Sequence, residues 1–408
     1  MLVTALVFQC YGPRTLALVG GATGQIGDPS GKHAERPLQN KAAVAENTQH
    51  IKDQIAYVMG HARAYAARRC GVEAVPGAWQ LVDNARWWSG MGLLDFFRDV
   101  GKHMRMGAMI SKDAVRSRMA TEDGLSLTEF CYQSLQAYDF CHLYEAEQCQ
   151  VQLGGSDQWG NIIAGIELVK KRDPQYASKP WNERMYGMTL PLLTTETGKK
   201  YGKSEGNAVW LDPTMTSPYD LWQFLRRTPD TEVARMLQLF TLVPQEELAA
   251  VMQHHAQEPR RGLPQVLLAR EVVELVHGAD VAAKTQQIVE LLHPIGRVLE
   301  PLNMDHVVAT LQGTTFEIQL PREEILNAPV AKIAVLAGLA PTLTVARKVM
   351  AQGGFFINQT AVRDPLAKLQ PEHIWSSPVT AAARAASDNG VMLLQSGKRS
   401  YRLVRVDP

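Results

Sequence analysis

The chain contains the stretch Gly154-Gly155-Ser156-Asp157-Gln158-Trp159-Gly160-Asn161, which follows a short apolar segment, residues 149–153. A helical pattern comes directly after it. A strand followed by a loop and a helix is the repeating unit of a parallel, doubly wound sheet. Ligands of such sheets bind beyond the carboxyl ends of the strands. Asp157 and Gln158 stand at that position, so we expect the carboxylate to hold ribose hydroxyls and the amide to hold a small polar ligand.

A second motif places two lysines around a glycine, in Lys200-Tyr201-Gly202-Lys203-Ser204. Further glycines bound this loop on both sides. Lysine is a compact point charge on a long stem, which suits phosphate groups. A solvated cluster of surface lysines is the plain alternative. The pattern favours a loop in which Lys200 and Lys203 reach the phosphates of a bound nucleotide.

A glycine-rich run, residues 20–32, follows an apolar strand pattern. It does not fit a phosphate-binding P-loop, because Ile26 stands where that motif needs glycine and His33 stands where it needs serine or threonine. The dinucleotide fingerprint fails as well, at Ala22. An ordinary turn is one reading of the run. The other is a ligand loop that presents the carboxylate of Asp28.

Three polar side chains share one face of the helix expected at residues 127–144. Tyr132, Gln136 and Asp139 stand at positions i, i+4 and i+7, which project from the same side of a helix. Exposure to solvent is the plain alternative for such a face. Apolar neighbours on the same helix favour partial burial. The pattern therefore indicates a polar pocket lined by this helix.

The charge of the chain is unevenly distributed. The 408 residues contain 42 Lys and Arg against 41 Asp and Glu, a formal net charge of +1. Residues 329–408 carry ten basic against four acidic side chains, a net of +6, so the rest of the chain carries about −5. A basic terminal module suits a nucleic-acid backbone. A solvated basic face remains the alternative.

The cysteine and hydropathy patterns exclude several classes of protein. The five cysteines form no Cys-x-x-Cys pair, so we expect free thiols in a reducing compartment and no metal site. No apolar run approaches the roughly 18 residues of a membrane span, which predicts no membrane partner. Residues 1–8 lack the basic leader and cleavage pattern of a signal peptide.

The order of the patterns predicts an α/β fold with additional domains. The expected parts are a doubly wound, parallel-sheet (Rossmann-like) domain at residues 1–228, a helical domain at 229–300, a linker at 301–328 and a small α+β domain at 329–408. At 46% hydrophobic content, a chain of this length can build more than one core. Within the first domain, we expect the alanine- and arginine-rich residues 60–80 to be a peripheral excursion.

Taken together, these motifs resemble those of the class I aminoacyl-tRNA synthetases. Residues 154–161 and 20–32 are similar to the tyrosyl-tRNA synthetase family almost letter for letter. The resemblance covers nearly the whole chain. It implies a tyrosine-tRNA ligase, which activates tyrosine with ATP to tyrosyl-adenylate and transfers it to tRNA(Tyr) for protein synthesis.

The resemblance assigns roles in the amino-acid pocket. It implies that Asp28, Tyr132 and Gln136 bind the ammonium group of L-tyrosine and that Gln158 orients the substrate. Asp139 would accept a hydrogen bond from the phenol. Phenylalanine would leave that buried acceptor unpaired, which explains discrimination against it.

The resemblance also assigns roles in ATP binding. It implies that Asp157 holds the ribose of ATP and that Lys200 and Lys203 contact its phosphates. Lys32 and Arg36 would contact pyrophosphate in the transition state, so the four cations are the expected catalytic residues. Mg²⁺ would accompany ATP with few direct protein ligands, and no prosthetic group is expected.

The C-terminal module resembles a small RNA-binding domain shared with a ribosomal small-subunit protein. Arg347 and Lys348 are the expected contacts to the tRNA backbone, followed by Arg399, Arg402 and Arg405. The resemblance further implies a homodimer formed by the catalytic domains.

One family motif does not occur in the sequence. Class I synthetases carry a His-x-Gly-His motif shortly before the region that this chain begins with, and the chain contains none. We expect a truncated gene prediction or an alternative start, a sheet without its first strand, and greatly reduced or no adenylation by the chain as written. A non-catalytic RNA-binding protein, such as a splicing helper, and an unrelated nucleotide-binding α/β enzyme are the alternatives.

Several details bear on localisation. Arg105-Met106-Gly107, the insertion at residues 60–80 and residues 258–262 are similar to the animal mitochondrial form of the family more than to the bacterial form. The resemblance therefore implies the mitochondrial matrix, with the cytoplasm as the alternative. No transit peptide is recognised in the chain.

Overall fold

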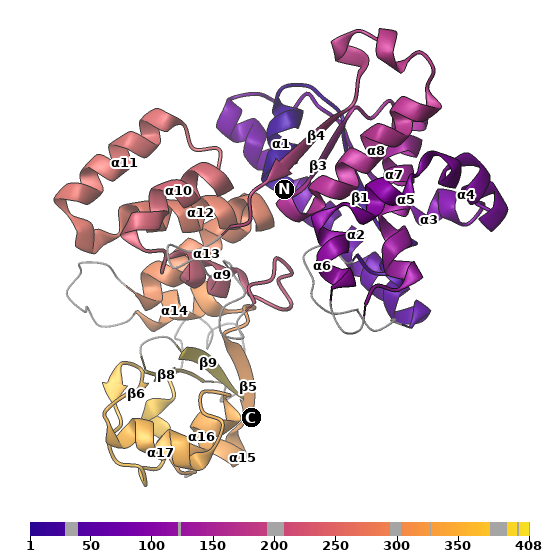
Figure 1. Cartoon of the computed structure of the whole chain (residues 1–408). Helices are drawn as coiled ribbons and strands as arrows, with labels where there is room; N and C mark the ends of the chain where they lie inside the picture. The colour runs from indigo at the N-terminus through magenta and orange to yellow at the C-terminus, as the bar shows by residue number, and fades with distance from the viewer. Residues whose placement is uncertain are drawn as a thin grey trace. The chain divides into compact units, whose positions relative to one another are not determined.

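The structure is a computed structural model that describes residues 1–28, 40–120, 124–193, 208–293, 303–326, 328–375, 390–397 and 400–407. The chain divides into two compact units, Met1–Val281 and Ala282–Pro408. Figure 1 shows their elements, coloured from indigo at the N-terminus to yellow at the C-terminus. Among the helices in the described ranges, none is long and apolar enough to cross a bilayer.

Two parallel strand pairs form the α/β part of the first unit. β1 (Thr15–Val19) pairs with β2 (Trp79–Asp83), and β3 (Val151–Gly155) pairs with β4 (Tyr186–Leu190). Parallel strands need a crossover connection, usually a helix. In the sequence, a long helix comes between the two strands of each pair. The pairing confirms the predicted α/β class. Within the described residues, the pairs are separate two-stranded sheets and not one continuous sheet.

Two helices of this unit pack closely against each other. The helices of the α/β part are α1 (Leu2–Cys10), α2 (Lys41–Cys70), α3 (Ala85–Trp88), α4 (Leu93–Asp99), α5 (Met106–Ile110), α6 (Asp113–Met119), α7 (Leu127–Glu147) and α8 (Trp159–Arg172). A Cβ on Gly165 of α8 would lie only 2.9 Å from Cδ1 of Phe140 on α7. Glycine therefore permits the close approach of α7, which carries the predicted polar face, to α8.

The N-terminus of α7 is fixed by its own sequence. The hydroxyl of Ser126 accepts a hydrogen bond from the backbone N–H of Glu129 at 3.2 Å, the usual arrangement of an N-cap serine. The buried core between α7 and α8 includes Phe140 and Ile162. The cap fixes where α7 begins, and packing against α8 determines which of its faces is buried.

α2 is longer than the sequence pattern predicted. It continues to Cys70, so residues 60–70 are helix and not a peripheral excursion. The reason is a continuous apolar face, since Val58, Ala62 and Ala66 follow one another at four-residue spacing and are buried. The helix ends at Gly71, whose φ of 65° is the left-handed conformation that glycine adopts readily at a helix C-terminus.

α2 packs against the helical part of the first unit. This part comprises α9 (Pro218–Leu225), α10 (Asp230–Phe240), α11 (Gln245–Gln257) and α12 (Leu263–His277). Tyr65 of α2 and Leu275 of α12 belong to one buried hydrophobic cluster. The segment that the sequence pattern assigned to the periphery is therefore part of a core.

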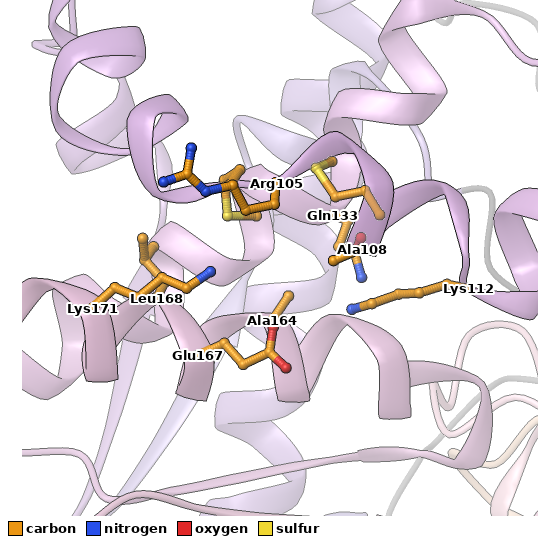
Figure 2. A pocket seen from close by; sticks show the side chains of 10 residues that line it. Arg105, Ala108, Lys112, Gln133, Ala164, Glu167, Leu168 and Lys171 are labelled. Carbon is orange, nitrogen blue, oxygen red and sulfur yellow. The ribbon is translucent and has the colours of Figure 1, made fainter. Parts of the chain in front are cut away.

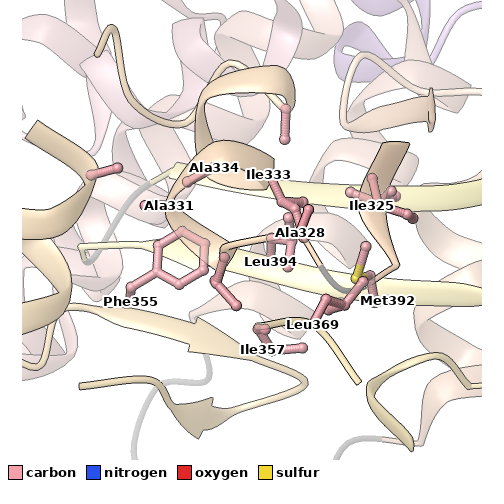
Figure 3. Packing of buried hydrophobic residues seen from close by; sticks show 14 of the residues in the cluster. Ile325, Ala328, Ala331, Ile333, Ala334, Phe355, Ile357, Leu369, Met392 and Leu394 are labelled. Atoms are coloured by element: carbon pink, nitrogen blue, oxygen red, sulfur yellow. The ribbon is translucent and has the colours of Figure 1, made fainter. Parts of the chain in front are cut away.

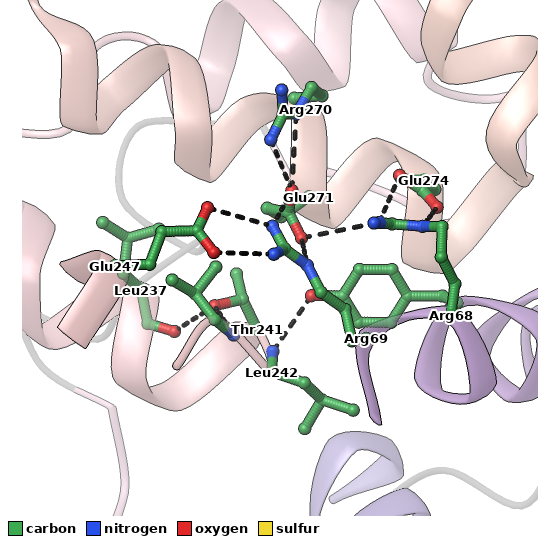
Figure 4. Close-up of polar contacts among 11 residues, drawn as sticks. Arg68, Arg69, Leu237, Thr241, Leu242, Glu247, Arg270, Glu271 and Glu274 are labelled. Atoms are coloured by element: carbon green, nitrogen blue, oxygen red, sulfur yellow. Dashed lines mark hydrogen bonds and ion pairs between the residues drawn. The ribbon is translucent and has the colours of Figure 1, made fainter. Parts of the chain in front are cut away.

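A cluster of charged side chains joins the end of α2 to α11 and α12 (Figure 4). Arg69 donates to Glu247 Oε2 at 2.8 Å and to Glu271 Oε2 at 2.6 Å. Arg68 makes two bonds to Glu274, at 2.7 and 2.8 Å. Glu271 has no exposed surface, and a buried charge is costly unless it is paired. These arginines therefore make the close packing of α2 on α12 possible.

The second unit contains a mixed five-stranded sheet and short helices. Its elements are α13 (Ala279–Leu292, which begins in the first unit), α14 (Met304–Leu311), β5 (Glu317–Pro321), α15 (Arg322–Ile325), α16 (Val330–Leu336), α17 (Leu343–Ala351), β6 (Phe355–Ile357), β7 (Thr360–Ala361), β8 (Val391–Ser396) and β9 (Ser400–Asp407). The strand order is β5-β9-β8-β6-β7. β5 is parallel to β9, and the other pairs are antiparallel. The helix pair, turn and strands agree with the predicted small α+β unit.

The stretch 301–328, predicted to be a linker, is folded in its described part. It contains α14, β5 and α15, and Ile325 is fully buried in the core of the second unit. Figure 3 shows Ile325 in that core together with Phe355 and Leu394. β5 is held in the sheet by pairing with β9, a strand near the end of the chain. Local sequence patterns do not reveal such a distant pairing.

We expect the substitution Glu271→Ala to lower the free energy of unfolding by about 3 to 5 kcal/mol, because Arg69, whose side chain is only 10% exposed, loses its buried partner. Urea denaturation measures this loss. Glu258→Ala is the matched control, since Glu258 pairs with Arg261 at 3.0 Å while both side chains are more than half exposed. The control should cost less than about 1 kcal/mol. Equal losses in the two variants would contradict the role given to the buried cluster.

The same cluster predicts a pH dependence. Burial alone would raise the pKa of Glu271, but the hydrogen bond and charge of Arg69 and the hydrogen bond from Arg270 hold this pKa below its ordinary value. A carboxyl whose pKa is lowered by folding contributes stability above its unfolded pKa of about 4.3, and the contribution is lost as pH falls through the folded pKa. The stability difference between wild type and Glu271→Ala should therefore shrink below about pH 4. Denaturation curves at pH 7 and at pH 3.5 test this, and an undiminished difference would refute it.

Candidate functional site

Polar side chains from three segments form a hydrogen-bonded network around Gln158. Its Nε2 donates to Asp28 Oδ2 at 2.7 Å and to Asp157 Oδ2 at 3.0 Å. Nδ2 of Asn161 donates to Oε1 of Gln158 at 3.3 Å and to Oε1 of Gln136 at 3.1 Å. The structure thus brings four of the predicted site residues into one network. Asn161, which connects α7 to the strand end, was not predicted.

The end of β3 positions Gln158 and Asp157. The strand ends at Gly155, and a short 3₁₀ turn (Ser156–Gln158) carries both side chains before α8 begins. A Cβ on Gly154 would lie 2.8 Å from Cβ of Gln158, so a glycine at 154 leaves room for this side chain over the strand. This is the position at which parallel sheets bind ligands.

The polar face of α7 is partly buried. Tyr132 and Gln136 lie one turn apart and are both half-buried, while Asp139 is 2% exposed. The solvent-facing alternative considered for this face therefore does not hold. Gln136 joins the network around Gln158 through Asn161. The face is turned toward the interior of the α/β part.

Asp139 is held by three donors from the segment after β2. Its Oδ1 accepts the indole N–H groups of Trp87 and Trp88, both at 2.7 Å, and its Oδ2 accepts Nδ2 of Asn84 at 3.0 Å. Burial raises the pKa of Asp139, and the bonds from Asn84, Trp87 and Trp88 oppose that rise. A carboxylate offers about four acceptor positions. These donors use three of them, which leaves capacity for about one more donor.

Asn84 connects Asp139 to the glycine-rich loop. It has no exposed surface. Its Nδ2 also donates to Oγ1 of Thr23 at 2.9 Å, and its Oδ1 accepts the backbone N–H of Ala22 at 2.8 Å. One side chain therefore contacts the loop after β1 and the carboxylate on α7. Because β1 and β2 are parallel neighbours, their carboxyl ends lie side by side, and this makes the contact possible.

Asp83 holds the same loop from the other side. Its Oδ1 accepts the backbone N–H groups of Gly21 at 3.2 Å and of Ala85 at 2.9 Å. Lys52 of α2 pairs with its Oδ2 at 2.5 Å. Burial tends to raise the pKa of Asp83, but the bond from Lys52 and the two backbone donors bring it below its ordinary value. The beginning of the glycine-rich run, at Gly21, is thus held by an ionised carboxylate.

Besides Asn161, five residues of this arrangement were not found by sequence reasoning: Lys52, Asp83, Asn84, Trp87 and Trp88. A signal for Asp83 and Asn84 exists, since they follow a predicted strand and strand ends of a parallel sheet collect polar residues. No local pattern indicates the two indoles, because their role depends on Asp139, which lies more than fifty residues away.

The predicted phosphate-binding cations lie outside the described residues. This applies to Lys32, Arg36, Lys200 and Lys203, so their predicted roles remain predictions. In the part of the chain that is described, no three His, Cys, Asp or Glu side chains come together in a group that could hold a metal ion.

A hollow of about 310 Å³, including its open mouth, is lined by side chains from α5, α7 and α8 and from the residues next to α5 (Figure 2). Gln133 and Lys112, which line it, both donate to the carbonyl of Gly160, at 3.0 and 2.9 Å. Burial lowers the pKa of Lys112, and the charge of Glu167 partly opposes this. The predicted amino-acid residues do not line this hollow. Its neighbourhood instead supports the first turn of α8, which carries Gly160.

Comparison with known proteins places these observations in a family. Residues 1–293 match the family of tRNA synthetases class I (W and Y). The chain is 38% identical over 401 residues to the mitochondrial tyrosine-tRNA ligase of Drosophila melanogaster, covering 97% of this chain and 81% of that protein. It is also 38% identical over 408 residues to the tyrosine-tRNA ligase of Roseiflexus castenholzii, covering 99% and 88%.

Solved structures give the same result. The C-terminally truncated mitochondrial tyrosyl-tRNA synthetase of Aspergillus nidulans is similar with a TM-score of 0.63 at 35% identity, over 71% of this chain and 81% of that one. The corresponding Coccidioides posadasii protein has a TM-score of 0.60 at 34% identity, over 69% and 75%.

We expect the substitution Asn84→Ala to lower the free energy of unfolding by about 1 to 3 kcal/mol. Asp139 loses one of its three donors, and the backbone N–H of Ala22 loses its acceptor. The free energy of unfolding from urea titration measures this. Asn182→Ala is the control, since Asn182 is exposed, and it should change stability by no more than about 0.5 kcal/mol. A loss no larger in Asn84→Ala than in the control would disprove the connecting role of Asn84.

Proposed function

The chain belongs to the tyrosine-tRNA ligases among the class I tRNA synthetases, and we propose that it activates L-tyrosine with ATP and transfers it to tRNA(Tyr). The observation that carries this proposal is the network of Asp28, Gln136, Asp157 and Gln158 at the end of β3, with the buried Asp139 farther along the same face of α7. The similarity over nearly the full chain favours this function over a non-catalytic RNA-binding role.

The amino-acid subsite is proposed on the polar face of α7. Asp28, Tyr132 and Gln136 bind the ammonium group, because a carboxylate and two polar oxygens offer the acceptors that an ammonium ion needs. Asp28 now accepts a bond from Gln158, so the ammonium would share that carboxylate. Gln158 then orients the bound substrate through its amide.

The phenol of tyrosine is proposed to bind Asp139. Trp87, Trp88 and Asn84 use three acceptor positions of this carboxylate, and a phenol O–H can use the remaining one. The three donors also fix the orientation of the carboxylate before the substrate arrives. A phenylalanine ring supplies no such donor, so its binding would bury an acceptor that stays unpaired.

Substitution of Asp139 tests this assignment. Asp139→Asn removes the charge that attracts the phenol O–H, so we expect the affinity ratio of tyrosine to phenylalanine to fall about tenfold or more, which corresponds to about 1.4 kcal/mol. Calorimetric titration with each amino acid measures the ratio. Asp53→Asn, on the exposed side of α2, is the control and should keep the wild-type ratio. An unchanged ratio in Asp139→Asn would rule out the phenol contact.

The activation step is proposed to need no protein nucleophile. The tyrosine carboxylate attacks the α-phosphate of ATP, a new O–P bond forms, and pyrophosphate leaves. The protein contributes positioning and charge stabilisation. Asp157 is proposed to hold the ribose, which its hydrogen bond to Gln158 would keep next to the amino-acid subsite.

The phosphate side of the reaction is proposed to depend on four cations. Lys32 ends the glycine-rich run, Arg36 follows it, and Lys200 and Lys203 form the lysine motif. Positive charge at the leaving pyrophosphate stabilises the charge that develops there. Mg²⁺ is proposed to enter with ATP, since this ion is usually held by substrate phosphates and one or two carboxylates.

The remaining domains are proposed to bind tRNA. We assign catalysis to residues 1–228, anticodon binding to the helices at 229–300, and further RNA binding to 329–408, whose sheet also includes β5 of the preceding stretch. Arg347 and Lys348 are both exposed on α17, which suits contacts to phosphates. Arg405 is less suited, because it donates to Glu317 at 2.8 Å.

The double substitution Arg347→Ala with Lys348→Ala should weaken tRNA binding and reduce the slope of log affinity against log salt by about 2, one unit for each phosphate contact. Binding titrations at several salt concentrations measure the slope. Lys332→Ala, an exposed cation on α16, is the control and should leave the slope within experimental error. If Lys332→Ala reduces the slope by as much per removed charge as the double substitution does, α17 has no specific role in binding tRNA.

Assembly and localisation complete the proposal. Large exposed hydrophobic side chains recur between residues 93 and 127, namely Leu93, Leu94, Phe97, Met106, Met119 and Leu127, each more than half exposed. Such exposure marks interaction surfaces, so we assign a homodimer contact to this region, which sedimentation of the purified protein tests.

The similarity to a mitochondrial relative supports the mitochondrial matrix, although the bacterial relative is equally similar, and fractionation of source cells tests this assignment.

A further inference from the structure

The side-chain amide of Asn161 connects two of the proposed tyrosine-binding residues. Its Nδ2 donates to Oε1 of Gln136 at 3.1 Å and to Oε1 of Gln158 at 3.3 Å. The side chain is only 6% exposed, and a buried amide that loses its partners is costly. The bonds of Asn161 therefore restrict how both glutamine amides are oriented.

Two carboxylates determine which end of the Gln158 amide faces them. Nε2 of Gln158 donates to Asp28 Oδ2 at 2.7 Å and to Asp157 Oδ2 at 3.0 Å. An ionised carboxylate only accepts hydrogen bonds, whereas an amide has one donor end and one acceptor end. Turning the amide over would place its oxygen against two carboxylate oxygens. The nitrogen of Gln158 is therefore held on the side of the carboxylates and its oxygen on the side of Asn161.

The same reasoning extends from Gln158 to Gln136. Oε1 of Gln158 only accepts, so Asn161 must present its nitrogen to it. This nitrogen carries two N–H bonds, and it donates the second one to Oε1 of Gln136. Gln158, Asn161 and Gln136 thus form an amide relay, in which the orientation of each amide determines that of the next. The two carboxylates at one end cause Gln136, at the other end, to present its oxygen.

Contacts to the neighbouring backbone fix the position of Asn161. The carbonyl of Gly160 accepts Nζ of Lys112 at 2.9 Å and Nε2 of Gln133 at 3.0 Å. Lys112 is the N-cap residue of α6, and Gln133 lies on α7, three residues before Gln136. Both bonds hold the first turn of α8 against these elements. Asn161 is therefore placed beside Gln136 by contacts that are not part of the amide relay.

We propose that Asn161 is a positioning residue that holds the amide oxygen of Gln136 toward the ammonium group of the substrate. This inference rests on the proposed function, which supplies L-tyrosine as the substrate. An amide oxygen can accept two hydrogen bonds, so the bond from Asn161 leaves one position for an ammonium N–H. If the Gln136 amide were turned over, its NH₂ group would face the ammonium group, and both would be donors. Asn161 thus contributes to recognition of the amino group through Gln136.

Two ligands that differ in the amino group test this role. L-Tyrosine and desaminotyrosine share the phenol and the carboxylate, but only tyrosine carries an ammonium group. The affinity of the full chain for each ligand is measured by calorimetric titration. Asn161→Leu removes both donated bonds, keeps nearly the same shape and adds no charge. We expect the affinity ratio of tyrosine to desaminotyrosine to fall about tenfold, because the ammonium loses an oriented acceptor.

A matched control separates this role from a structural one. Gln133→Leu removes another buried amide that contacts the first turn of α8, and it should keep the wild-type ratio because Lys112 still donates to Gly160. Urea denaturation shows whether each variant is folded, and Asn161→Ala replaces Asn161→Leu if the latter does not fold. An unchanged ratio, or an equal loss of affinity for both ligands, would overturn the proposal. A tenfold fall in Gln133→Leu would also contradict it.

A double substitution tests the route through Gln136. Gln136→Met removes the amide oxygen at nearly the same side-chain length. In this background, Asn161→Leu should lower the ratio by no more than about twofold, since the two residues act as one unit. A second full tenfold fall would contradict the amide relay.

The same titrations distinguish this inference from the function on which it rests. Wild-type protein that binds tyrosine, together with a ratio that Asn161→Leu does not change, would overturn the role of Asn161 and leave the proposed function standing. Wild-type protein that does not bind tyrosine would overturn both.

Discussion

The buried carboxylate of Asp139 sets the constraint on which the candidate site depends. A charge removed from water is costly unless donors replace the water, and here the donors come from the segment after β2. Asn84 supplies one of them and at the same time holds Thr23 and the backbone of Ala22. The glycine-rich loop, the end of β2 and α7 are therefore parts of one hydrogen-bonded unit. A change in any of them alters the position of the others.

Ion pairs made by α2 also attach the helical part of the first unit to the region of the candidate site. α2 contributes Lys52 to the carboxylate of Asp83 near its middle and Arg69 to the buried Glu271 at its end. Both contacts pair a carboxylate with a cation from one helix. α2 therefore connects the glycine-rich loop to α12 through two ion pairs, and the helical part is attached to the region that carries the site.

Features that depend on residues close together in the sequence could be predicted, and features that depend on contacts between distant residues could not. The positions of Asp157 and Gln158 could be predicted, because a strand end is a local pattern with a known consequence in parallel sheets. The face of α7 was predictable from helical spacing. The donors to Asp139 were not, because Trp87 and Trp88 acquire their role only through packing against a distant helix. Residues 60–70 and the described part of 301–328 were misjudged for the same reason, since their burial depends on α12 and on β9.

The most direct test of the account is tyrosine-dependent ATP–pyrophosphate exchange by the protein purified from its natural source. We expect exchange that requires tyrosine and is not supported by phenylalanine at equal concentration. Tyrosine binding without any exchange would contradict the account and favour a non-catalytic RNA-binding protein. Equal exchange with both amino acids would contradict the role given to Asp139 and its three donors.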